Sequence, residues 1–412
     1  MPLTRIDLDH MKPATRSVHA GRHIDLGHAA PTVPAIHVAT AYTYPTTAEV
    51  DEVFADNSRG YVYSRMGNPT VRALEHAIAA TEGMDEGIVY ASGMAAIHGV
   101  IAGLAKPGDT VIASRDVYGA TYSVLNTYFS EFGIDSVLVD MTDIAEVERK
   151  VQDLSPALVF TETISNPLIK VVDVRRIAEI AHAAGAKLAL DNTFATPVVT
   201  RAADLGADVV LYSSTKHLGG HGDTTGGVLA TSSEIAHTLR EHLKLVGGVA
   251  SPFDAWLVLR GLRTLDLRVR KQSQNACLLA QWLAGDERVE TVYYPKQTDD
   301  LPKGQFQDGL LGTMLAFEIK GAMTADVFRF QDALRMIQPA TTLGDVHTIV
   351  LHPATTSHRG LSPEDRAVYG IRDGLVRLSA GIEDASDIIA DLDAALDAAV
   401  GVAGSGDGKS RG

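Results

Sequence analysis

Apolar and polar positions alternate in blocks along the chain from about residue 66 onwards. The stretch 70–83 (TVRALEHAIAATEG) has helical apolar spacing and ends at a glycine, whereas 87–92 (GIVYAS) is a short apolar run typical of a buried strand. A second helical stretch, 93–109 (GMAAIHGVIAGLAKPGD), ends at a Lys-Pro-Gly-Asp turn. Strands that alternate with helices predict βαβ units and a mostly parallel sheet.

The same alternation continues to about residue 264, after which the order of elements changes. Further strands are expected at 110–114 (TVIAS), 135–140 (DSVLVD), 157–162 (ALVFTE), 187–192 (KLALDN), 208–213 (DVVLYS) and 226–231 (GGVLAT), with a helix at 171–186. Later strands are expected at 289–295, 312–321, 347–353 and 375–381, with a last helix at 387–400. The pattern predicts an α/β protein with a large domain (66–264) and a smaller α+β domain (265–402).

The two ends of the chain lack this pattern. Residues 1–65 have no steady period, and the Pro- and Thr-rich stretch 28–50 predicts an extended arm. Residues 403–412 are mostly Gly, Ser and charged residues, which predicts a disordered tail.

Composition and charge exclude several classes of function. The chain has 412 residues with a net charge of −15 and no long Lys/Arg cluster, so binding to nucleic acid is not expected. No segment resembles a signal peptide or a membrane span, which predicts a cytoplasmic protein without a membrane partner. Cys277 is the single cysteine, which excludes an internal disulfide and a multi-cysteine metal site.

Polar side chains stand where several predicted strands end. Ser92, Asp191 and Ser213 each follow directly on an apolar run, and Thr215 and Lys216 come two and three residues after Ser213. In doubly wound sheets, ligands bind at the carboxyl ends of the strands. Three separate segments of the chain therefore converge on one rim, which predicts a binding site there.

Lys216 is the most informative of these residues. A lysine that is partly removed from water has a lowered pKa and becomes a usable amine nucleophile, although an isolated lysine at a strand end more often reaches solvent. Ser213 and Thr215 beside it offer hydroxyls suited to an anion. His217 and His221 are four residues apart, but the Leu-Gly-Gly between them makes a helix with metal ligands unlikely, so no metal is expected.

A carboxylate and a phosphate cradle complete the pattern. Asp191 would need a cationic partner such as a protonated pyridine nitrogen, or it would cap the following turn. Gly93 and Met94 lie at a strand-to-helix turn, where free backbone N–H groups suit a phosphate. Amine, carboxylate and cradle together match the aldehyde, ring nitrogen and phosphate of pyridoxal 5′-phosphate (PLP).

Seven ordered motifs carry a resemblance over almost the whole chain. They are YVYSRMGNPT, SGMAAI, DVYGATY, LALDNTFATP, YSSTKHLGGHGD, HPATTSH and LVRLSAGIED. The chain resembles the Cys/Met-metabolism (trans-sulfuration, γ-family) PLP-dependent enzymes of fold type I, nearest the group of methionine γ-lyase, cystathionine γ-lyase and O-acetylhomoserine sulfhydrylase.

The resemblance implies a role for each matched position. Catalytic roles fall to Lys216, which would bind the cofactor's aldehyde and move protons, to Asp191 at the ring nitrogen, and to Tyr118, which would stack on the ring. The residues implied in holding the phosphate are Gly93, Met94, Ser213 and Thr215, with Tyr63 and Arg65 reaching it from a neighbouring subunit. The residues implied in binding the substrate carboxylate are Arg377, Thr342 and Asn166. Without the resemblance, Tyr63 and Tyr118 would be read as packing aromatics and Arg377 as a surface ion-pair residue.

The resemblance also implies an assembly and a reaction class. The family forms homotetramers as dimers of dimers, whose sites are shared between subunits. γ-Elimination would release 2-oxobutanoate and ammonia from a homoserine- or homocysteine-derived amino acid. γ-Replacement, as in O-acetyl- or O-succinylhomoserine sulfhydrylase or in cystathionine γ-synthase, is the alternative. A binding or regulatory protein with the same fold, without enzyme activity, is a further possibility. Such a protein has no need of both a reactive amine and a proton shuttle, so the intact set of Lys216, Asp191, Tyr118 and Arg377 argues against it.

The pocket for the leaving group departs from the patterns of the known subgroups. Val62 and His347 stand where cystathionine-handling members have acidic residues, and Ala120 stands where well-known methionine γ-lyases have a cysteine. We therefore expect a γ-lyase with an unusual leaving-group pocket shaped by these three residues. The sequence does not identify the leaving group or the role of His217.

Overall fold

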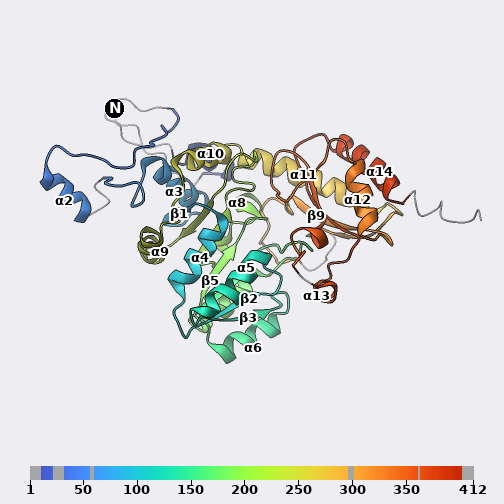
Figure 1. Ribbon diagram of the computed structural model, residues 1–412, viewed down its shortest axis with the longest axis horizontal. Helices are drawn as coiled ribbons and strands as arrows, with labels where there is room; N and C mark the ends of the chain where they lie inside the picture. Colours follow the sequence, from blue (N-terminus) through green and yellow to red (C-terminus); the bar gives the residue numbers. More distant parts are fainter. Residues whose placement is uncertain (1–10, 22–31, 56–59, 296–300, 361, 401–412) are drawn as a thin grey trace, which may run out of the picture.

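The computed structural model describes residues 11–21, 32–55, 60–295, 301–360 and 362–400. Within these ranges one sheet has seven strands, in the order β1-β7-β6-β5-β4-β2-β3 (Figure 1). The strands are β1 (Glu86–Tyr90), β2 (Thr110–Ser114), β3 (Asp135–Val139), β4 (Leu158–Glu162), β5 (Lys187–Asp191), β6 (Val209–Ser213) and β7 (Gly227–Thr231). Strand β7 is antiparallel to both of its neighbours, and the other pairings are parallel. The predicted, mostly parallel α/β sheet is confirmed.

Helices cover both faces of this sheet because alternate residues of its strands face opposite ways. In β2, Ile112 packs into one apolar core with α3 and α7, whereas Val111 and Ala113 pack into another with α4 and α9. The helices of this part are α3 (Pro69–Glu82), α4 (Gly93–Leu104), α5 (Gly119–Ser123), the π-helix η2 (Val124–Phe129), α6 (Ile144–Leu154), α7 (Val174–Ala183), α8 (Thr196–Val199), the 3-10 helix η3 (Ala202–Leu205), α9 (Ser233–Val246) and α10 (Pro252–Leu262). Two layers of helices therefore bury the strands, as their nearly continuous apolar sequences require.

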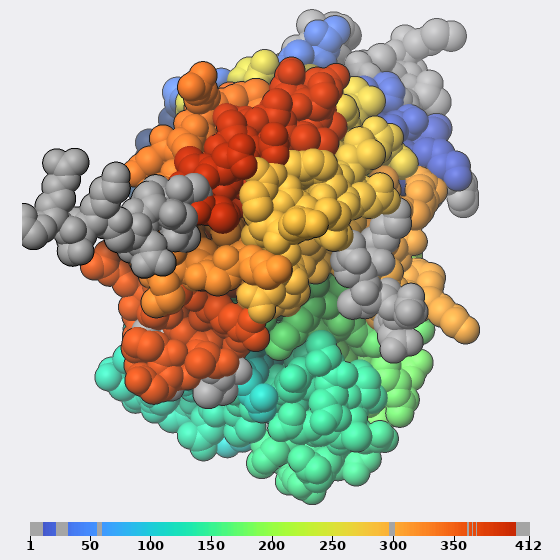
Figure 2. All heavy atoms as spheres, turned by 90° about the vertical axis from the view of Figure 1, so that its right-hand side faces the viewer, coloured from blue at the N-terminus to red at the C-terminus, as the bar shows by residue number. Residues whose placement is uncertain are grey.

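A second sheet follows, with five strands among the described residues, in the order β10-β11-β12-β9-β8. Its elements are α11 (Leu265–Ala284), β8 (Val289–Tyr293), β9 (Met314–Ile319), α12 (Thr324–Ala333), β10 (Gln338–Pro339), β11 (Ile349–Leu351), the 3-10 helix η5 (Pro353–Thr355), α13 (Pro363–Val368), β12 (Leu375–Ser379) and α14 (Ala385–Val400). Figure 2 shows this orange-to-red part packed directly on teal and green residues of the part that contains the first sheet. Residues of the second sheet can therefore reach the rim of the first. The domain limits themselves stay predictions.

The N-terminal region contains two helices that the sequence did not predict. These are α1 (Pro13–His19) and α2 (Thr47–Ala55), and α2 corrects the expectation of extended backbone over 28–50 at its last four positions. The threonine before α2, Thr46, accepts a hydrogen bond from the backbone N–H of Glu49 at 3.2 Å, which satisfies one free donor of the first turn. The tail 403–412 lies outside the described residues.

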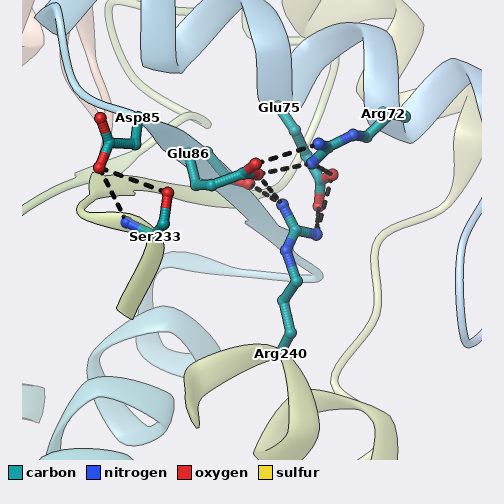
Figure 3. A network of polar contacts seen from close by, with 7 residues as sticks. Arg72, Glu75, Asp85, Glu86, Ser233 and Arg240 are labelled. Carbon is teal, nitrogen blue, oxygen red and sulfur yellow. Dashed lines mark hydrogen bonds and ion pairs between the residues drawn. The ribbon is translucent and has the colours of Figure 1, made fainter. Parts of the chain in front are cut away.

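Four charged side chains join α3, β1 and α9 (Figure 3). Arg72 contacts Glu75 at 3.0 Å and Glu86 at 2.8 Å, and Arg240 contacts the same two carboxylates at 2.8 Å each. Opposite charges alternate around this group, so each carboxylate that is partly removed from water has two cationic partners. The network fixes α9 against the beginning of the sheet.

No helix in the described part of the chain is both long and apolar enough to cross a membrane.

Candidate active site

A cavity of about 670 Å³ opens where β1, β4, β5 and β6 end. These four strands point the same way, because β7 reverses direction between β6 and β1. The residues that line the cavity include Ser92, Gly93, Met94, Tyr118, Glu162, Asn166, Asp191, Thr193, Ser213, Thr215, Lys216, Thr341, Leu343, Thr355, Ser357 and Arg377. The structure thus brings the polar residues at the predicted strand ends together around one space.

Lys216 follows β6 and points its amine into this cavity. Its Nζ donates a hydrogen bond to Thr342 Oγ1 at 3.0 Å. Burial, with a smaller contribution from the nearby Arg377 guanidinium, lowers the pKa of Lys216 to about 8. A larger fraction of this amine than of an ordinary lysine is therefore uncharged near neutral pH, and condensation with an aldehyde requires the uncharged form.

Asp191 ends β5, and its carboxylate is held by Thr193, two residues further along the chain. The backbone N–H of Thr193 donates to Asp191 Oδ1 at 2.9 Å. Burial raises the pKa of Asp191, while the Thr193 hydrogen bonds oppose that rise. Within the described chain no ion pair neutralises this carboxylate, so a cation of the right size is needed beside it.

Glu162 ends the neighbouring strand β4, and it lines the same cavity. Its Oε1 accepts a hydrogen bond from the backbone N–H of Tyr118 at 2.7 Å. Burial and the negative charge of Asp191 raise the pKa of Glu162 well above its usual value. Because the Thr193 hydrogen bonds favour the charged form of Asp191, we assign the proton of this pair to Glu162.

The N-terminus of α4 forms the opposite wall. Ser92 caps the helix by accepting a hydrogen bond from the Ala95 N–H at 3.1 Å, and the first N–H groups of a helix have no acceptor within it. A Cβ added to Gly93 would lie 3.1 Å from Ser213 Oγ, so the glycine leaves room in front of that hydroxyl. Thr215 Oγ1 accepts from the Gly226 N–H at 3.0 Å. Backbone donors and hydroxyls around this space fit a phosphate group.

Arg377 lies on β12 and reaches the cavity from the second sheet. It is 4% exposed, its Nη1 donates to Asn166 Oδ1 at 2.9 Å, and its Nη2 donates to the Thr342 carbonyl at 3.0 Å. Its Nε is buried and has no hydrogen-bond partner in the structure. Burial lowers the pKa of Arg377 to about 10. An unsatisfied donor on a buried guanidinium is suited to a carboxylate ligand.

A smaller cavity of about 300 Å³ adjoins the first. Asn166 and Ser357 line both cavities, whereas Ala120 and His358 line the smaller one. Burial, followed by the Arg377 charge, lowers the pKa of His358 to about 4, so its imidazole is neutral near pH 7. Asp116, the carboxylate in this lining, is paired with Lys170 at 2.9 Å.

Besides Thr342, which contacts Lys216 and Arg377, four of the sequence-predicted residues do not line these two cavities. Tyr63 is 42% exposed, with the Arg65 guanidinium 5.7 Å from its ring centre. Arg65 donates to the Lys244 carbonyl, and with Val62 it lines a separate cavity of about 610 Å³. His347 is also exposed and lies 3.3 Å from Asp345. The roles of these four residues in a shared site stay predictions.

The sequence did not predict several of the lining residues, among them Glu162 and Thr193. Glu162 ends an apolar run as Asp191 does, so the same signal was present at both positions. Thr193 gave no such signal, because its importance comes from hydrogen bonds that only the folded loop shows.

Metal ligands do not gather in the described ranges, where no group of three or more His, Cys, Asp or Glu side chains could hold an ion. His217 is buried between Thr193 and Thr313, and His221 Nδ1 lies 2.7 Å from the Gly219 carbonyl.

A family model described as Cys/Met metabolism PLP-dependent enzyme matches residues 14–397. An O-succinylhomoserine sulfhydrylase of Pseudomonas aeruginosa is 43% identical over 87% of this chain and 89% of its own. An L-methionine gamma-lyase of Pseudomonas putida is 39% identical over 93% of this chain and 97% of its own.

The fold comparison agrees with the sequence comparisons. The crystal structure of cystathionine gamma synthase from Xanthomonas oryzae pv. oryzae in complex with aminoacrylate and cysteine superposes with a TM-score of 0.87 at 36% identity. The superposition covers 95% of this chain and 99% of the cystathionine gamma synthase chain.

Proposed function

This chain belongs to the family of Cys/Met metabolism PLP-dependent enzymes, and on that premise we propose that it catalyses γ-elimination on a γ-substituted L-amino acid. The products would be 2-oxobutanoate, ammonia and the released γ-substituent. The observation that carries the proposal is the single cavity in which Lys216, Asp191 and Arg377 meet.

The three residues suit three parts of one reaction. Bound PLP supplies an aldehyde for the lysine and a ring that accepts electrons from the substrate. Lys216, with its lowered pKa, removes the Cα proton of the substrate and then a Cβ proton. Asp191 keeps the ring nitrogen protonated. Tyr118 packs beside the reacting atoms and is held there by Glu162.

Arg377 orients the substrate. Its free Nε and the rest of its guanidinium bind the α-carboxylate, while Asn166 and the Thr342 carbonyl hold the guanidinium plane. Binding of the carboxylate fixes the Cα–H bond of the substrate relative to Lys216. The Lys216 amine donates a hydrogen bond to Oγ1 of Thr342, the same residue whose carbonyl holds Arg377.

The smaller cavity takes the γ-substituent in this proposal. It adjoins the main cavity at Asn166 and Ser357, and Ala120 leaves room there. The Asp116 carboxylate is already paired with Lys170, so this lining offers no free negative charge for a distal ammonium group. A neutral γ-substituent, such as a thioether or an ester, suits it better than that of cystathionine.

A keto-acid assay tests the proposed elimination. The holoenzyme is given L-methionine, L-homocysteine, O-acetyl- and O-succinyl-L-homoserine and L-cystathionine in parallel, and 2-oxobutanoate is measured. We expect release from at least one of the first four substrates, slower release from cystathionine, and none from Lys216→Ala with any substrate. A wild-type enzyme that binds PLP and releases no keto acid from this panel would overturn the proposal.

γ-Replacement on an O-acylhomoserine is the second candidate. The 43% identical relative named O-succinylhomoserine sulfhydrylase favours it. Adding sulfide together with O-acetyl- or O-succinyl-L-homoserine separates the two reactions. Homocysteine in place of 2-oxobutanoate would assign the enzyme to replacement.

We further infer a cytoplasmic homotetramer, built as a dimer of dimers, in which Tyr63 and Arg65 complete the phosphate site of a neighbour. The exposure of both residues in the single chain supports this inference.

A further inference from the structure

His217 follows Lys216 directly and connects two distant parts of the chain. Its side chain is 1% exposed. Nδ1 lies 3.2 Å from the Thr193 carbonyl oxygen, and Nε2 lies 2.6 Å from Thr313 Oγ1. Both ring nitrogens are therefore engaged, one toward the first sheet and one toward the second.

The partners determine the tautomer of this ring. A carbonyl oxygen only accepts hydrogen bonds, so Nδ1 carries the proton and donates to Thr193. Burial, followed by the Arg268 guanidinium, lowers the pKa of His217 to about 3, so the ring is neutral. Its Nε2 then accepts a hydrogen bond from the Thr313 hydroxyl. One imidazole thus donates to one side and accepts from the other.

Thr193 passes this constraint on to the cofactor site. Its N–H donates to Asp191 Oδ1 at 2.9 Å, and its Oγ1 accepts from the Ser213 N–H at 2.8 Å. Its third polar group is the carbonyl that His217 holds. The position of Thr193 therefore fixes two groups: the Asp191 carboxylate, which serves the ring nitrogen in the proposed function, and the backbone of Ser213 at the end of β6.

Thr313 makes the connection to the substrate side. It directly precedes β9, and its carbonyl accepts from the Ala380 N–H at 3.0 Å. Strand β9 pairs with β12, where Ala316 lies opposite Arg377. The His217 ring also needs space, since a Cβ added to Gly344 would lie 2.8 Å from Nδ1.

We infer that His217 is a positioning residue that ties the Asp191–Thr193 loop to the strand beside Arg377. PLP and the substrate carboxylate are thereby held in one fixed geometry. The inference rests on the PLP site of the proposed function and holds for elimination and replacement alike. A tyrosine at position 217 would have one hydroxyl and could not reproduce a donor and an acceptor at two separate ring positions.

Three variants test the inference. His217→Phe keeps a ring and loses both bonds, His217→Asn keeps an amide donor near the position of Nδ1, and Thr313→Val removes only the hydroxyl. Thr81→Val is the matched control, because Thr81 loses an equally buried hydroxyl bond to Ala77 inside α3, away from the site. The measurements are the PLP dissociation constant of the apoprotein, KM, kcat and the thermal midpoint.

We expect His217→Phe to weaken PLP binding roughly tenfold and His217→Asn to recover part of that loss. Thr313→Val should raise KM for the amino acid more than it lowers kcat, because it releases the strand beside Arg377. The double variant His217→Phe/Thr313→Val should bind PLP no more weakly than His217→Phe, because both changes break the same connection, which runs from Thr193 through His217 to Thr313.

The inference is overturned if His217→Phe lowers the thermal midpoint and leaves PLP binding at the level of Thr81→Val. Additive losses in the double variant would overturn it as well. If His217→Phe fails to fold, Thr313→Val decides alone. The inference then stands if KM rises more than kcat falls, and it is overturned if KM does not rise. A wild-type enzyme without keto-acid release would defeat the proposed elimination, but the PLP affinities would still be measurable.

Discussion

At the residue scale, the site depends on which of two adjacent carboxylates holds a proton. Glu162 and Asp191 both have raised pKa values. Thr193 opposes the rise at Asp191 with two hydrogen bonds, whereas Glu162 has one from the Tyr118 N–H and its pKa is raised further by the charge of Asp191. A neutral Glu162 still accepts the Tyr118 N–H through Oε1. The two carboxylates therefore have different functions although they end neighbouring strands.

Exchange of each carboxyl group for its amide tests this assignment. Glu162→Gln keeps shape, neutrality and the acceptor for Tyr118, so PLP affinity and kcat/KM should stay within about threefold of the wild type. Asp191→Asn removes the charge at the ring nitrogen, and kcat/KM should fall by about a hundredfold or more. Steady-state kinetics and PLP titration measure both. Equal losses in the two variants would contradict the assignment.

The lowered pKa of Lys216 predicts a pH dependence for reconstitution. Only the uncharged amine reacts with an aldehyde, and burial lowers the pKa of Lys216 to about 8. The rate at which the apoprotein takes up PLP should rise from pH 6.5 and level off above about pH 9. Lys216→Arg is the control, since it keeps a cation without the reactive amine. A rate that keeps rising beyond pH 10 would indicate an ordinary lysine.

Single residues were predictable where one charge interrupts an apolar run. Lys216 and Asp191 stand out in the sequence for this reason, and Glu162 could have been found by the same rule. Thr193 and the partners of His217 could not, because their contacts join segments far apart in the chain. A threonine looks the same in sequence whether its hydroxyl faces water or a strand end.

At the scale of elements, periodicity predicted the long helices and the buried strands well. The expected helix 70–83 corresponds to α3, and the strands before Asp191 and Ser213 are β5 and β6. The π-helix after α5 and the two-residue strand β10 were missed, since each is set by tertiary contacts and not by a repeat. Helix α2 was missed because its sequence, TAEVDEVFA, follows a Pro- and Thr-rich segment without a strong apolar face.

Helix α3 ends in a buried acid with consequences for stability. Glu82 is fully buried and accepts a hydrogen bond from Tyr212, whose hydroxyl also accepts from Asn192 Nδ2 at 2.9 Å. Burial raises the pKa of Glu82 from 4.5 to about 7. Between these pH values the folded protein binds more protons at this group than the unfolded chain. Stability contributed by the group is therefore lost as pH rises from 4.5 to 7.

Glu82→Gln should remove that pH dependence. Relative to the wild type, the variant should gain roughly 2–3 kcal/mol in free energy of unfolding between pH 5 and pH 8, as expected for a shift of this size. Thermal midpoints measured across this range show the difference, with the exposed Glu131→Gln as the control. Parallel pH curves for Glu82→Gln and the wild type would contradict the raised pKa.

At the scale of the whole molecule, the second sheet completes a site that the first sheet begins. Arg377 and Thr342 come from the C-terminal part and meet Lys216 and Asn166 from the large sheet. Figure 2 shows the two parts in direct contact. The sequence predicted both sheets, but the joining of their cores at Met314, Leu343 and Leu375 follows only from the folded chain.

The loop with Tyr63 and Arg65 carries the proposed contribution of one subunit to the active site of another. Both side chains are exposed and lie outside the cavity that contains Lys216. If they serve the phosphate site of a neighbour, each active site needs Lys216 from one subunit and Arg65 from another. Two inactive variants should then repair one another in a mixed oligomer.

Mixing Lys216→Ala with Arg65→Ala tests this expectation. In a mixed dimer, one site has Lys216 and the partner's intact Arg65 together, while the other site lacks both. Random exchange of subunits should therefore restore activity to about a quarter of the wild-type sites, because half of the dimers are mixed and each has one complete site. Coexpression supplies the random mixture, and 2-oxobutanoate release by the unfractionated protein measures its activity. Mixing Lys216→Ala with Asp191→Asn is the control, since both residues act in the same chain and no complete site can form. No recovery in the test pair would place Arg65 in the site of its own subunit or outside it altogether, whereas recovery in the control would show that the gain in the test pair does not depend on Arg65.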